Sequence, residues 1–396
     1  MTANPIATVT GMNIRTAPVF RIVVLQPTTL CNLNCNYCYL PGRDKQNLMA
    51  PAAAELIAAA ITDQAASNLD LEPVTVLWHG GEPTATPLDH FRQLLKPFEP
   101  LRADGLIRHS IQTNATLITP EWIDVFVTHG FNVSVSLDGP PHLNAERINR
   151  AGRPAHDQVM AGCRALQQAG LAPHVICVIT PATAPHIREV ISYLDQAGFP
   201  VIGFNFEEHE GINTGRPMLT RDEARRVWTE ILTYYRDTPG AADRFGIREL
   251  MLLARYLNGY APLDRDTIPT ICWNGDIVLL SPELAGVTSP RYGDFVAGNI
   301  YKESLRGVLA RRHSIPYVAE FERGLAECAD SCSYWPVCYG GYASNRYAER
   351  GRFDVASTQH CRTMRQELVN AVLDLADPQQ DAAMIRQLTP LTQAPG

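Results

Sequence analysis

The sequence predicts an α/β fold: a partial, TIM-like (β/α)6 barrel followed by a cysteine-rich, loop-rich C-terminal domain. Six short runs rich in β-branched residues alternate with helical stretches over the first 210 residues, and the alternation then stops. Seven of the ten cysteines gather in two clusters, one near each end of the chain. Six repeats, where a closed barrel of this type has eight, favour an open barrel.

The alternation defines the elements of the expected barrel. The expected strands are Ile22–Gln26, Val74–Trp78, His109–Thr113, Asn132–Ser136, His174–Thr180 and Val201–Phe206. The expected helices between them are Ala52–Ser67, Leu88–Pro97, Pro120–Thr128, Asp157–Ala169 and Ala184–Ala197. Strands joined by crossover helices form a parallel sheet with right-handed connections. The runs are typical of strands buried on both faces.

The second half of the chain has a different pattern. We expect two helices within Thr220–Gly259, a strand at Asp276–Leu280 and a last helix at Thr363–Ala376. The predicted organisation is an N-terminal segment (1–19), the barrel (20–215), bridging helices (216–264), a cysteine-rich domain (265–376) and a partly disordered tail (377–396).

Composition excludes several classes of partner. The net charge is −7 and no run is rich in lysine and arginine, which argues against a nucleic-acid partner. No apolar run approaches the roughly 20 residues that a membrane span needs. The first residues lack the features of a signal peptide, so the expected location is cytoplasmic.

Three cysteines, Cys31, Cys35 and Cys38, lie within eight residues directly after the first expected strand. Clustered thiols in a reducing compartment usually bind a metal or act in catalysis. Three thiolates leave one iron of a [4Fe–4S] cluster open, whereas a structural zinc site needs four ligands. The Cx3Cx2C spacing, with Tyr37 before the last cysteine, resembles the signature of radical S-adenosylmethionine (SAM) enzymes.

The resemblance covers roughly residues 20–210. It implies that the open iron binds the amino and carboxylate groups of SAM. It also implies that one electron from the cluster cleaves SAM to methionine and a 5′-deoxyadenosyl radical. An electron donor such as a flavodoxin or a ferredoxin is then required.

Further candidates for SAM binding follow the expected strands, because α/β sheets bind ligands at the carboxyl ends of their strands. The Gly-Gly-Glu-Pro turn resembles the family's site for the SAM amino group; the alternative is a tight turn with a solvated glutamate. Asn114, Ser136 and Arg147 would reach the ribose or carboxylate, or else cap helices and turns. Ile179 would flank the adenine or belong to the core. The candidates are Tyr37, Gly80, Gly81, Glu82, Pro83, Asn114, Ser136, Arg147 and Ile179.

The C-terminal cysteines supply four thiolates, which suit either zinc or an iron–sulfur cluster. Behind a radical SAM barrel they resemble a SPASM domain, which implies auxiliary [4Fe–4S] clusters. A full SPASM domain has about seven cysteines for two clusters, but Tyr342 stands at one of those positions here. We therefore expect one auxiliary cluster. Its ligands are Cys328, Cys332, Cys338 and Cys361.

The remaining three cysteines, Cys163, Cys177 and Cys272, stand alone in the sequence. Cys163 and Cys177 are interpreted as small core residues. Cys272 is interpreted as a buried structural thiol, the alternative being a lone ligand.

Short motifs in the second half resemble peptide maturases that form cyclophanes. That resemblance implies abstraction of a side-chain β-hydrogen and attack of the carbon radical on an aromatic ring. Glu283 and Glu210 are the candidate catalytic acids, with a turn acid and a solvated loop as the alternatives. The motifs are Trp273-Asn-Gly-Asp276, Ser281-Pro-Glu-Leu284, Tyr292-Gly293, Gly298-Asn299-Ile300 and Cys338-Tyr-Gly-Gly341.

The sequence therefore predicts a radical SAM/SPASM oxidoreductase that joins an aliphatic carbon to an aromatic ring in a ribosomally made precursor peptide. Alternatives are a thioether-forming maturase, an anaerobic sulfatase (formylglycine) maturase and, more remotely, a non-catalytic zinc-binding protein. About twenty residues precede the first strand, so we expect a precursor peptide to dock on the barrel, on the C-terminal domain or on another protein.

Overall fold

Ten strands form one sheet in the order β10-β9-β8-β1-β2-β3-β4-β5-β6-β7 in the computed structural model, which describes residues 15–67, 72–259 and 267–393. Strands β1 to β7 are parallel, β8 pairs parallel with β1, and β9 and β10 continue antiparallel. The strands are β1 (Ile22–Leu25), β2 (Val74–Trp78), β3 (Ile107–Thr113), β4 (Asn132–Ser136), β5 (His174–Ile179), β6 (Val201–Phe206), β7 (Gly246–Ile247), β8 (Thr270–Ile271), β9 (Asp276–Val278) and β10 (Val296–Asn299).

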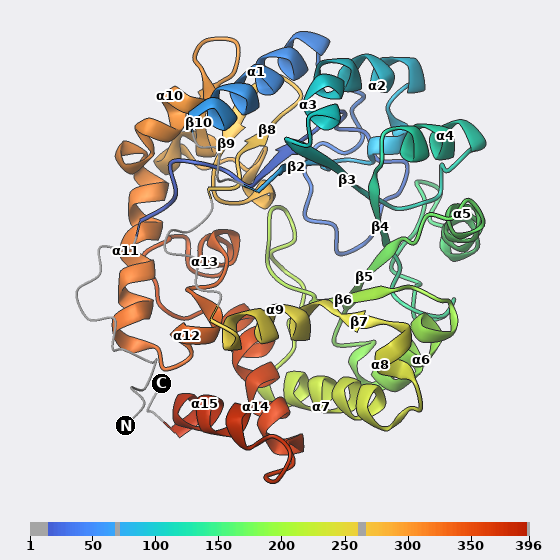
Figure 1. Ribbon diagram of the computed structural model, residues 1–396, viewed down its shortest axis with the longest axis vertical. Coiled ribbons are helices and arrows are strands. Elements are labelled where there is room, and N and C mark those ends of the chain that lie inside the picture. The colour runs from blue at the N-terminus through green and yellow to red at the C-terminus, as the bar shows by residue number, and fades with distance from the viewer. Residues whose placement is uncertain (1–14, 68–71, 260–266, 394–396) are drawn as a thin grey trace.

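The strands form an arc with the helices outside it, and α9, α12 and α13 lie where the arc stays open (Figure 1). The partial barrel is thus confirmed. The barrel helices are α1 (Pro51–Ser67), α2 (Leu88–Leu95), α3 (Glu99–Ala103), α4 (Pro120–Thr128), α5 (His156–Gln168) and α6 (Ile187–Gln196). The later helices are α7 (Arg221–Asp237), α8 (Ala241–Arg244), α9 (Arg248–Leu257), α10 (Leu305–Ala310), α11 (Pro316–Ser331), α12 (Trp335–Cys338), α13 (Ala343–Arg350), α14 (Glu367–Leu375) and α15 (Ala382–Gln393).

All six expected strands are present, and the expected barrel helices agree within three residues at their ends. One expectation about the strands was wrong. Along β2, β3, β4 and β5 buried residues alternate with half-buried or exposed ones. The buried set packs into the hydrophobic core, and the other set points to the opposite face of the sheet.

The C-terminal half is more helical than the sequence indicates. Helix α11 buries Tyr317, Phe321 and Leu325, so this region is well packed. Its core is continuous with that of the barrel. The tail from 377 onward, expected to be partly disordered, forms α15 over most of its length. Helix α14 is preceded directly by a π-helical segment at Cys361–Gln366. Such segments occur frequently at functional sites.

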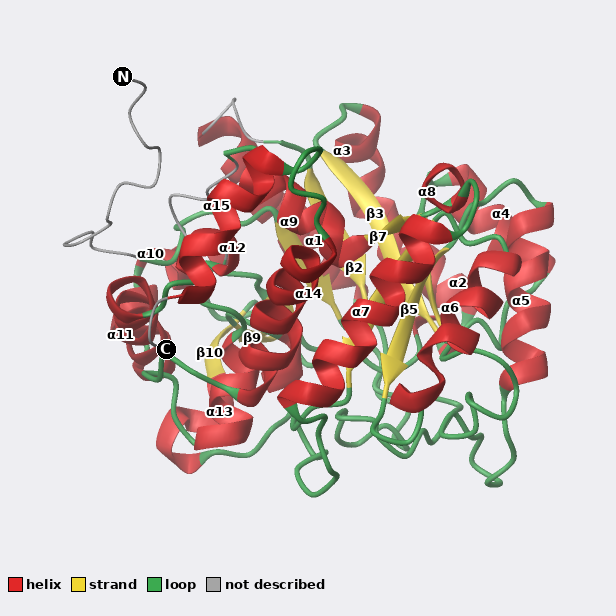
Figure 2. Cartoon of the chain, turned by 90° about the horizontal axis from the view of Figure 1, so that it is seen from below, coloured by secondary structure: helices red, strands yellow, loops and turns green. Residues whose placement is uncertain are grey.

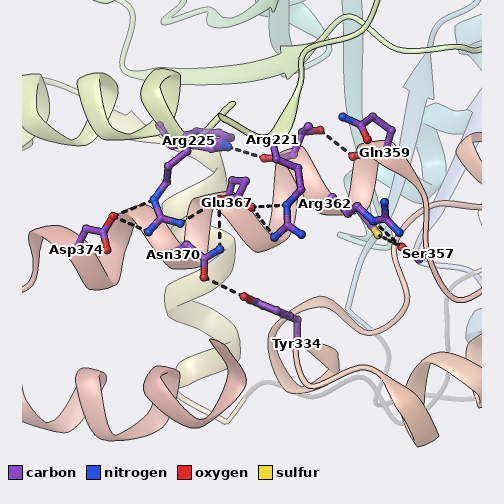
Figure 3. Close-up of polar contacts among 12 residues, drawn as sticks. Arg221, Arg225, Tyr334, Ser357, Gln359, Arg362, Glu367, Asn370 and Asp374 are labelled. Atoms are coloured by element: carbon purple, nitrogen blue, oxygen red, sulfur yellow. Dashed lines mark hydrogen bonds and ion pairs between the residues drawn. The ribbon is translucent and has the colours of Figure 1, made fainter. Parts of the chain in front are cut away.

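A polar network joins the C-terminal region to the barrel (Figure 3). The Glu367 carboxylate on α14 is buried and forms ion pairs with Arg221 and Arg225 of α7 at 2.6 and 2.9 Å. Asn370 donates to Glu367 and accepts from the hydroxyl of Tyr334, which lies between two of the C-terminal cysteines. The network fixes the cysteine-bearing segment relative to α7.

The carboxyl ends of the barrel strands share one edge, where long loops gather in the direction of the β5 arrow (Figure 2). The candidate site residues lie on or near these loops. Among the helices that the structure describes, none is long and apolar enough to cross a membrane.

Candidate functional site

The three N-terminal cysteines lie on the loop that follows β1, and each is a free, half-buried thiol. The segment 146–150 fixes this loop. The backbone N–H of Asn34 donates to Ile148 O at 2.7 Å, and that of Asn36 donates to Glu146 O at 3.1 Å. The guanidinium of Arg150 donates to the carbonyl of Cys31 at 2.6 Å. These contacts from one segment therefore define the conformation of the cysteine loop.

The electrostatics of these thiols disfavour the free thiolate. Burial first, and the Glu82 carboxylate second, raise the pKa of Cys31 to about 12. Burial raises the pKa of Cys35 to about 11, although the Arg147 guanidinium lowers it. The negative charges of Cys35 and Cys38 also raise the pKa of Cys31, and that of Cys38 raises the pKa of Cys35. A bound cation would supply the missing positive charge, so this donor set suits iron ligation.

The Gly-Gly-Glu-Pro turn packs directly against the cysteine loop. A side chain on Gly81, whose φ is +83°, would lie 2.5 Å from the carbonyl oxygen of Thr28 and 2.9 Å from that of Leu30. The backbone N–H of Glu82 donates to the same Leu30 oxygen at 2.7 Å. Pro83 begins a short buried 3-10 turn. Glycine is required here because two backbone segments approach closely.

Glu82 is not the solvated glutamate of the alternative interpretation, because its carboxylate is buried and fully used by protein donors. One oxygen accepts from the Thr84 and Thr113 hydroxyls at 2.6 Å each and from the Thr84 N–H, and the other accepts from Asn114 N–H at 2.7 Å. Burial raises the pKa of Glu82 and these bonds oppose the rise. Its carboxylate therefore joins β2 to β3.

Asn114 and Ser136 extend this arrangement along the strand ends. The Asn114 amide nitrogen donates to Asn32 at 2.9 Å and lies 3.8 Å from the sulfur of Cys31. Ser136 accepts from Gln112 at 2.8 Å. Both lie at the edge that the sequence indicated, with Asn114 directly beside the cysteine loop. Ile179 is fully buried, which agrees with the core alternative for that residue.

Arg147, the candidate for the SAM carboxylate, is fixed by a protein carboxylate. It forms a two-bond ion pair with Asp138, 2.9 Å at each bond, and both side chains are buried. Asp138 also accepts from the Tyr37 hydroxyl and from Val178 N–H. Asp138 thus connects the cysteine loop with β5, a role that sequence reasoning missed. Its position two residues beyond β4 was the available signal.

The two candidate catalytic acids, 73 positions apart, lie in one buried cluster with Glu208. Burial, and then the charges of Glu208 and Glu283, raise the pKa of Glu210 well above its ordinary value. Burial raises the pKa of Glu283, with Glu208 adding to the rise. Tyr39, the residue after Cys38, is buried against the same acids, and its hydroxyl lies 2.9 Å from His79 Nε2. Glu210 is buried and is not the solvated acid of its alternative interpretation, whereas Glu283 lies in the 3-10 turn Pro282–Leu284 and accepts from the Ser281 hydroxyl, as the turn-acid alternative expects.

The acidic cluster also contacts the C-terminal cysteine region. Ser344 donates to Glu210 at 2.6 Å, and Asn345 donates to Glu208 and Glu210. His360, the residue before Cys361, forms an ion pair with Glu208. Buried acids therefore lie between the segment that follows Cys38 and the segment that precedes Cys361.

The four C-terminal cysteines line one pocket, although they come from α11, the turn after it, α12 and the π-helical segment. All four are free thiols. Burial, together with the neighbouring thiols, raises the pKa of Cys328 to about 12, although the Arg346 guanidinium lowers it. Within the described residues no three ligand-type side chains converge as they would on a single ion. An iron–sulfur cube needs wider spacing because each thiolate binds a different iron. The donor set fits such a cluster.

The lone cysteines lie in the core. Cys163 and Cys177 are fully buried, as expected for small core residues. Cys272 is also buried and belongs to the same hydrophobic core, which agrees with the structural interpretation.

Comparison with known proteins agrees with this geometry. The family model for the radical SAM superfamily matches residues 25–194. An uncharacterized protein of Synechocystis is 30% identical over 364 residues, which cover 89% of this chain and 91% of that protein. The chain belongs to the radical SAM superfamily. It is therefore a radical SAM enzyme, and its family implies a [4Fe–4S] cluster and SAM.

Other similar proteins are peptide- or protein-modifying enzymes. A serine-type anaerobic sulfatase-maturating enzyme of Bacteroides thetaiotaomicron is 29% identical over 187 residues, 46% of this chain and 45% of that one. The chain thus spans about half the length of that relative. Among solved structures, anSMEcpe with AdoMet and the Cp18Cys peptide has a TM-score of 0.71 at 19% identity, over 89% of this chain and 96% of that one. Streptococcus suis SuiB with its precursor peptide SuiA has a TM-score of 0.65 at 19% identity, over 87% and 76%. At these identities the likeness shows the fold.

Proposed function

We propose that this radical SAM enzyme is a peptide maturase that forms a carbon–carbon crosslink between a side-chain β-carbon and an aromatic ring of a ribosomally made peptide. In this proposal Cys31, Cys35 and Cys38 bind the [4Fe–4S] cluster that chelates SAM. The C-terminal cysteine pocket, within a SPASM-type domain over 265–376, binds one auxiliary [4Fe–4S] cluster.

The iron–sulfur groups and SAM supply the electron and the radical that begin the reaction. The protein's own residues position them. Gly80 and Gly81 bring backbone close to the cysteine loop, and Asn114 places its amide beside Cys31. Asp138 fixes Tyr37 and Arg147 at the same edge. Glu82 holds the Gly-Gly-Glu-Pro turn against β3 through its carboxylate, and in this proposal that turn meets the SAM amino group.

The reaction removes two hydrogen atoms from the peptide. One leaves as a hydrogen atom to the deoxyadenosyl radical. The other leaves the aromatic ring as a proton and an electron. Glu210 and Glu283 are suited to accept that proton, because their raised pKa values bring them nearer to neutral pH than an ordinary glutamate.

The observation that carries the proposal is the position of the acidic cluster between the two cysteine sites. Tyr39 follows Cys38 and lies against Glu210 and Glu283. On the other side, His360 precedes Cys361 and contacts Glu208. A peptide radical formed near the first site would thus have a proton acceptor and an electron acceptor close to it. The solved neighbours support a peptide substrate, since anSMEcpe and SuiB were each solved with a peptide bound.

The test is co-expression with a candidate precursor peptide under anaerobic conditions, followed by tandem mass spectrometry. The proposal predicts loss of two hydrogens, a segment that yields no internal fragments, and unmodified cysteines. A peptide whose mass never changes in the presence of reduced enzyme and SAM would contradict it.

A second candidate function is formylglycine formation, which the similarity to the sulfatase-maturating enzyme favours. That product carries an aldehyde in place of a serine or cysteine side chain. Capture by a hydrazide reagent would identify it, whereas a crosslinked peptide would not react. A thioether product would differ from both, because a cysteine sulfur would be consumed.

A further inference from the structure

We propose that Arg346 and Arg365 raise the reduction potential of the auxiliary cluster by directing N–H groups and positive charge at its thiolates and sulfides. This inference rests on the proposed ligation of that cluster by the C-terminal cysteine pocket. In this inference, two residues that are not cluster ligands make the cluster a better electron acceptor.

Arg346 lies on α13 and is only 2% exposed. Its Nη2 donates to the sulfur of Cys328 at 3.2 Å and to the carbonyl of Gly340 at 2.7 Å, while Nη1 donates to Phe353 O at 3.0 Å. The guanidinium also stacks on the ring of Phe321, 5.0 Å from its centroid. These contacts give the charge a fixed position against one ligand.

The surrounding sequence makes room for this guanidinium. A side chain on Gly324 would lie 2.1 Å from Arg346 Nη1 and 2.5 Å from the Phe353 carbonyl oxygen that accepts from it. Gly340, whose carbonyl accepts from Nη2, has a φ of +90°, and a side chain there would lie 2.2 Å from Leu325. Gly324 therefore leaves the space that the guanidinium occupies.

Arg365 lies in the π-helical segment and lines the pocket together with the four cysteines. Its Nη2 donates to the Tyr342 hydroxyl at 3.1 Å, and its guanidinium lies 5.5 Å from the centroid of that ring. Its Nε is buried and has no acceptor among the described residues. A buried N–H without an acceptor is costly, so an acceptor within the pocket is the natural partner. Cluster sulfur atoms are such acceptors.

The effect on potential follows from charge. A [4Fe–4S] cluster with four thiolates is anionic, and reduction adds one more negative charge. Buried positive charge and N–H bonds to sulfur stabilise the reduced form more than the oxidised form, which raises the potential. A cluster held there would be the acceptor for the one electron that leaves the cyclising peptide radical, and the accompanying proton would go to a carboxylate of the acidic cluster.

The experiment uses the full chain with Cys31, Cys35 and Cys38 replaced by alanine, so that only the auxiliary site can hold a cluster. After anaerobic reconstitution, a redox titration monitored by electron paramagnetic resonance (EPR) gives the midpoint potential. Arg346→Met and Arg365→Met remove the charge and the donors, so each should lower the potential. Arg346→Lys keeps the charge and should lower it less. The matched control is Arg350→Gln, which removes an exposed arginine one turn further along α13 and should leave the potential unchanged.

The outcomes separate this inference from the ligation on which it rests. If the parent protein binds no iron and gives no cluster signal, the proposed ligation is wrong. If the cluster is present but both methionine variants keep the parent's potential, the inference is overturned. Should Arg346→Met fail to hold a cluster, Arg365→Met and Arg346→Lys still give the potential, and an unchanged value in both overturns it.

Discussion

The two cysteine sites differ in ligand number and in the groups that approach their sulfur atoms. The N-terminal site offers three half-buried thiols on a loop at the strand ends. The C-terminal site offers four thiols that line one pocket. The neutral amide of Asn114 approaches Cys31, whereas the guanidinium of Arg346 approaches Cys328. Three ligands leave an iron open for a substrate, and four ligands leave a cluster suited to electron transfer.

The two sites also differ in how the positive charge near their cysteines is compensated. Arg147 lies near Cys35, but Asp138 binds it in a buried ion pair. At the C-terminal site Arg365 has a buried N–H without an acceptor in the part of the chain that the structure describes. A low potential suits reduction of SAM, and a higher one suits acceptance of an electron. In the proposed function the molecule therefore separates an electron-donating site from an electron-accepting one.

The largest expected effect is at the N-terminal site. Replacing Cys31, Cys35 or Cys38 with alanine removes one of only three ligands, so SAM cleavage should fall to background. The assay is 5′-deoxyadenosine formation by chromatography with a chemical reductant. Cys163→Ala, at a buried core thiol, is the control and should retain cleavage. Normal deoxyadenosine yield in a triad variant would contradict the assignment.

Loss of a C-terminal ligand should uncouple the reaction. In Cys332→Ala the first site remains intact, so deoxyadenosine should still form while crosslinked peptide does not. Both products are measured in one reaction with peptide present. Cys272→Ala, at a buried thiol of the core, should keep both. A full yield of crosslinked peptide from Cys332→Ala would remove the second site from the mechanism.

The acidic cluster between the sites predicts a pH dependence. Glu210 accepts a proton only when ionised, and its pKa is raised by burial and by Glu208 and Glu283. Product formation should therefore fall as the pH decreases through a value above the ordinary glutamate range. Glu210→Gln should lower the rate by roughly 10²-fold and flatten this profile.

The matched control for that profile is Glu230→Gln, which changes a half-exposed acid on the surface of α7. It should leave the rate and its pH dependence unchanged. An unaltered profile in both Glu210→Gln and Glu283→Gln would exclude these acids as proton acceptors.

The smallest expected effect concerns charge compensation at the N-terminal site. Asp138→Asn leaves Arg147 buried without its carboxylate, which should lower the free energy of unfolding by about 3–5 kcal/mol. In the folded fraction, the positive charge near Cys35 should raise the potential of the N-terminal cluster. Urea denaturation measures the first effect, and a redox titration of protein lacking the C-terminal cysteines measures the second. If this substitution leaves the midpoint potential of the N-terminal cluster unchanged, the Arg147–Asp138 ion pair does not cause the difference between the two sites.

The sequence predicts the barrel well because its signals are local. Runs such as Val201–Phe206 are long enough to identify by composition alone. Strands β7 and β8 have two residues each and exist only because β6 and β1 offer partners, so no local pattern indicates them. The helical C-terminal region was underestimated for a similar reason, since α11 is stabilised by long-range packing.

In the candidate site, too, some features follow from local sequence patterns and others depend on the tertiary fold. The cysteines were evident from spacing, and Glu210 and Glu283 were singled out individually. Their approach to each other depends on the tertiary fold. Asp138 and Arg346 were missed because a single acid or arginine has no distinctive pattern in the sequence. Only burial and contact with Tyr37 or Cys328 distinguish them.

The most direct test of the two-site account is EPR of the reduced cluster in two variants, recorded with and without SAM. One variant lacks the three N-terminal cysteines and the other lacks the four C-terminal ones. We predict that SAM changes the spectrum of the variant that keeps Cys31, Cys35 and Cys38 and leaves the other spectrum unchanged. The reverse pattern, or a spectrum that SAM does not alter in either variant, would contradict the account.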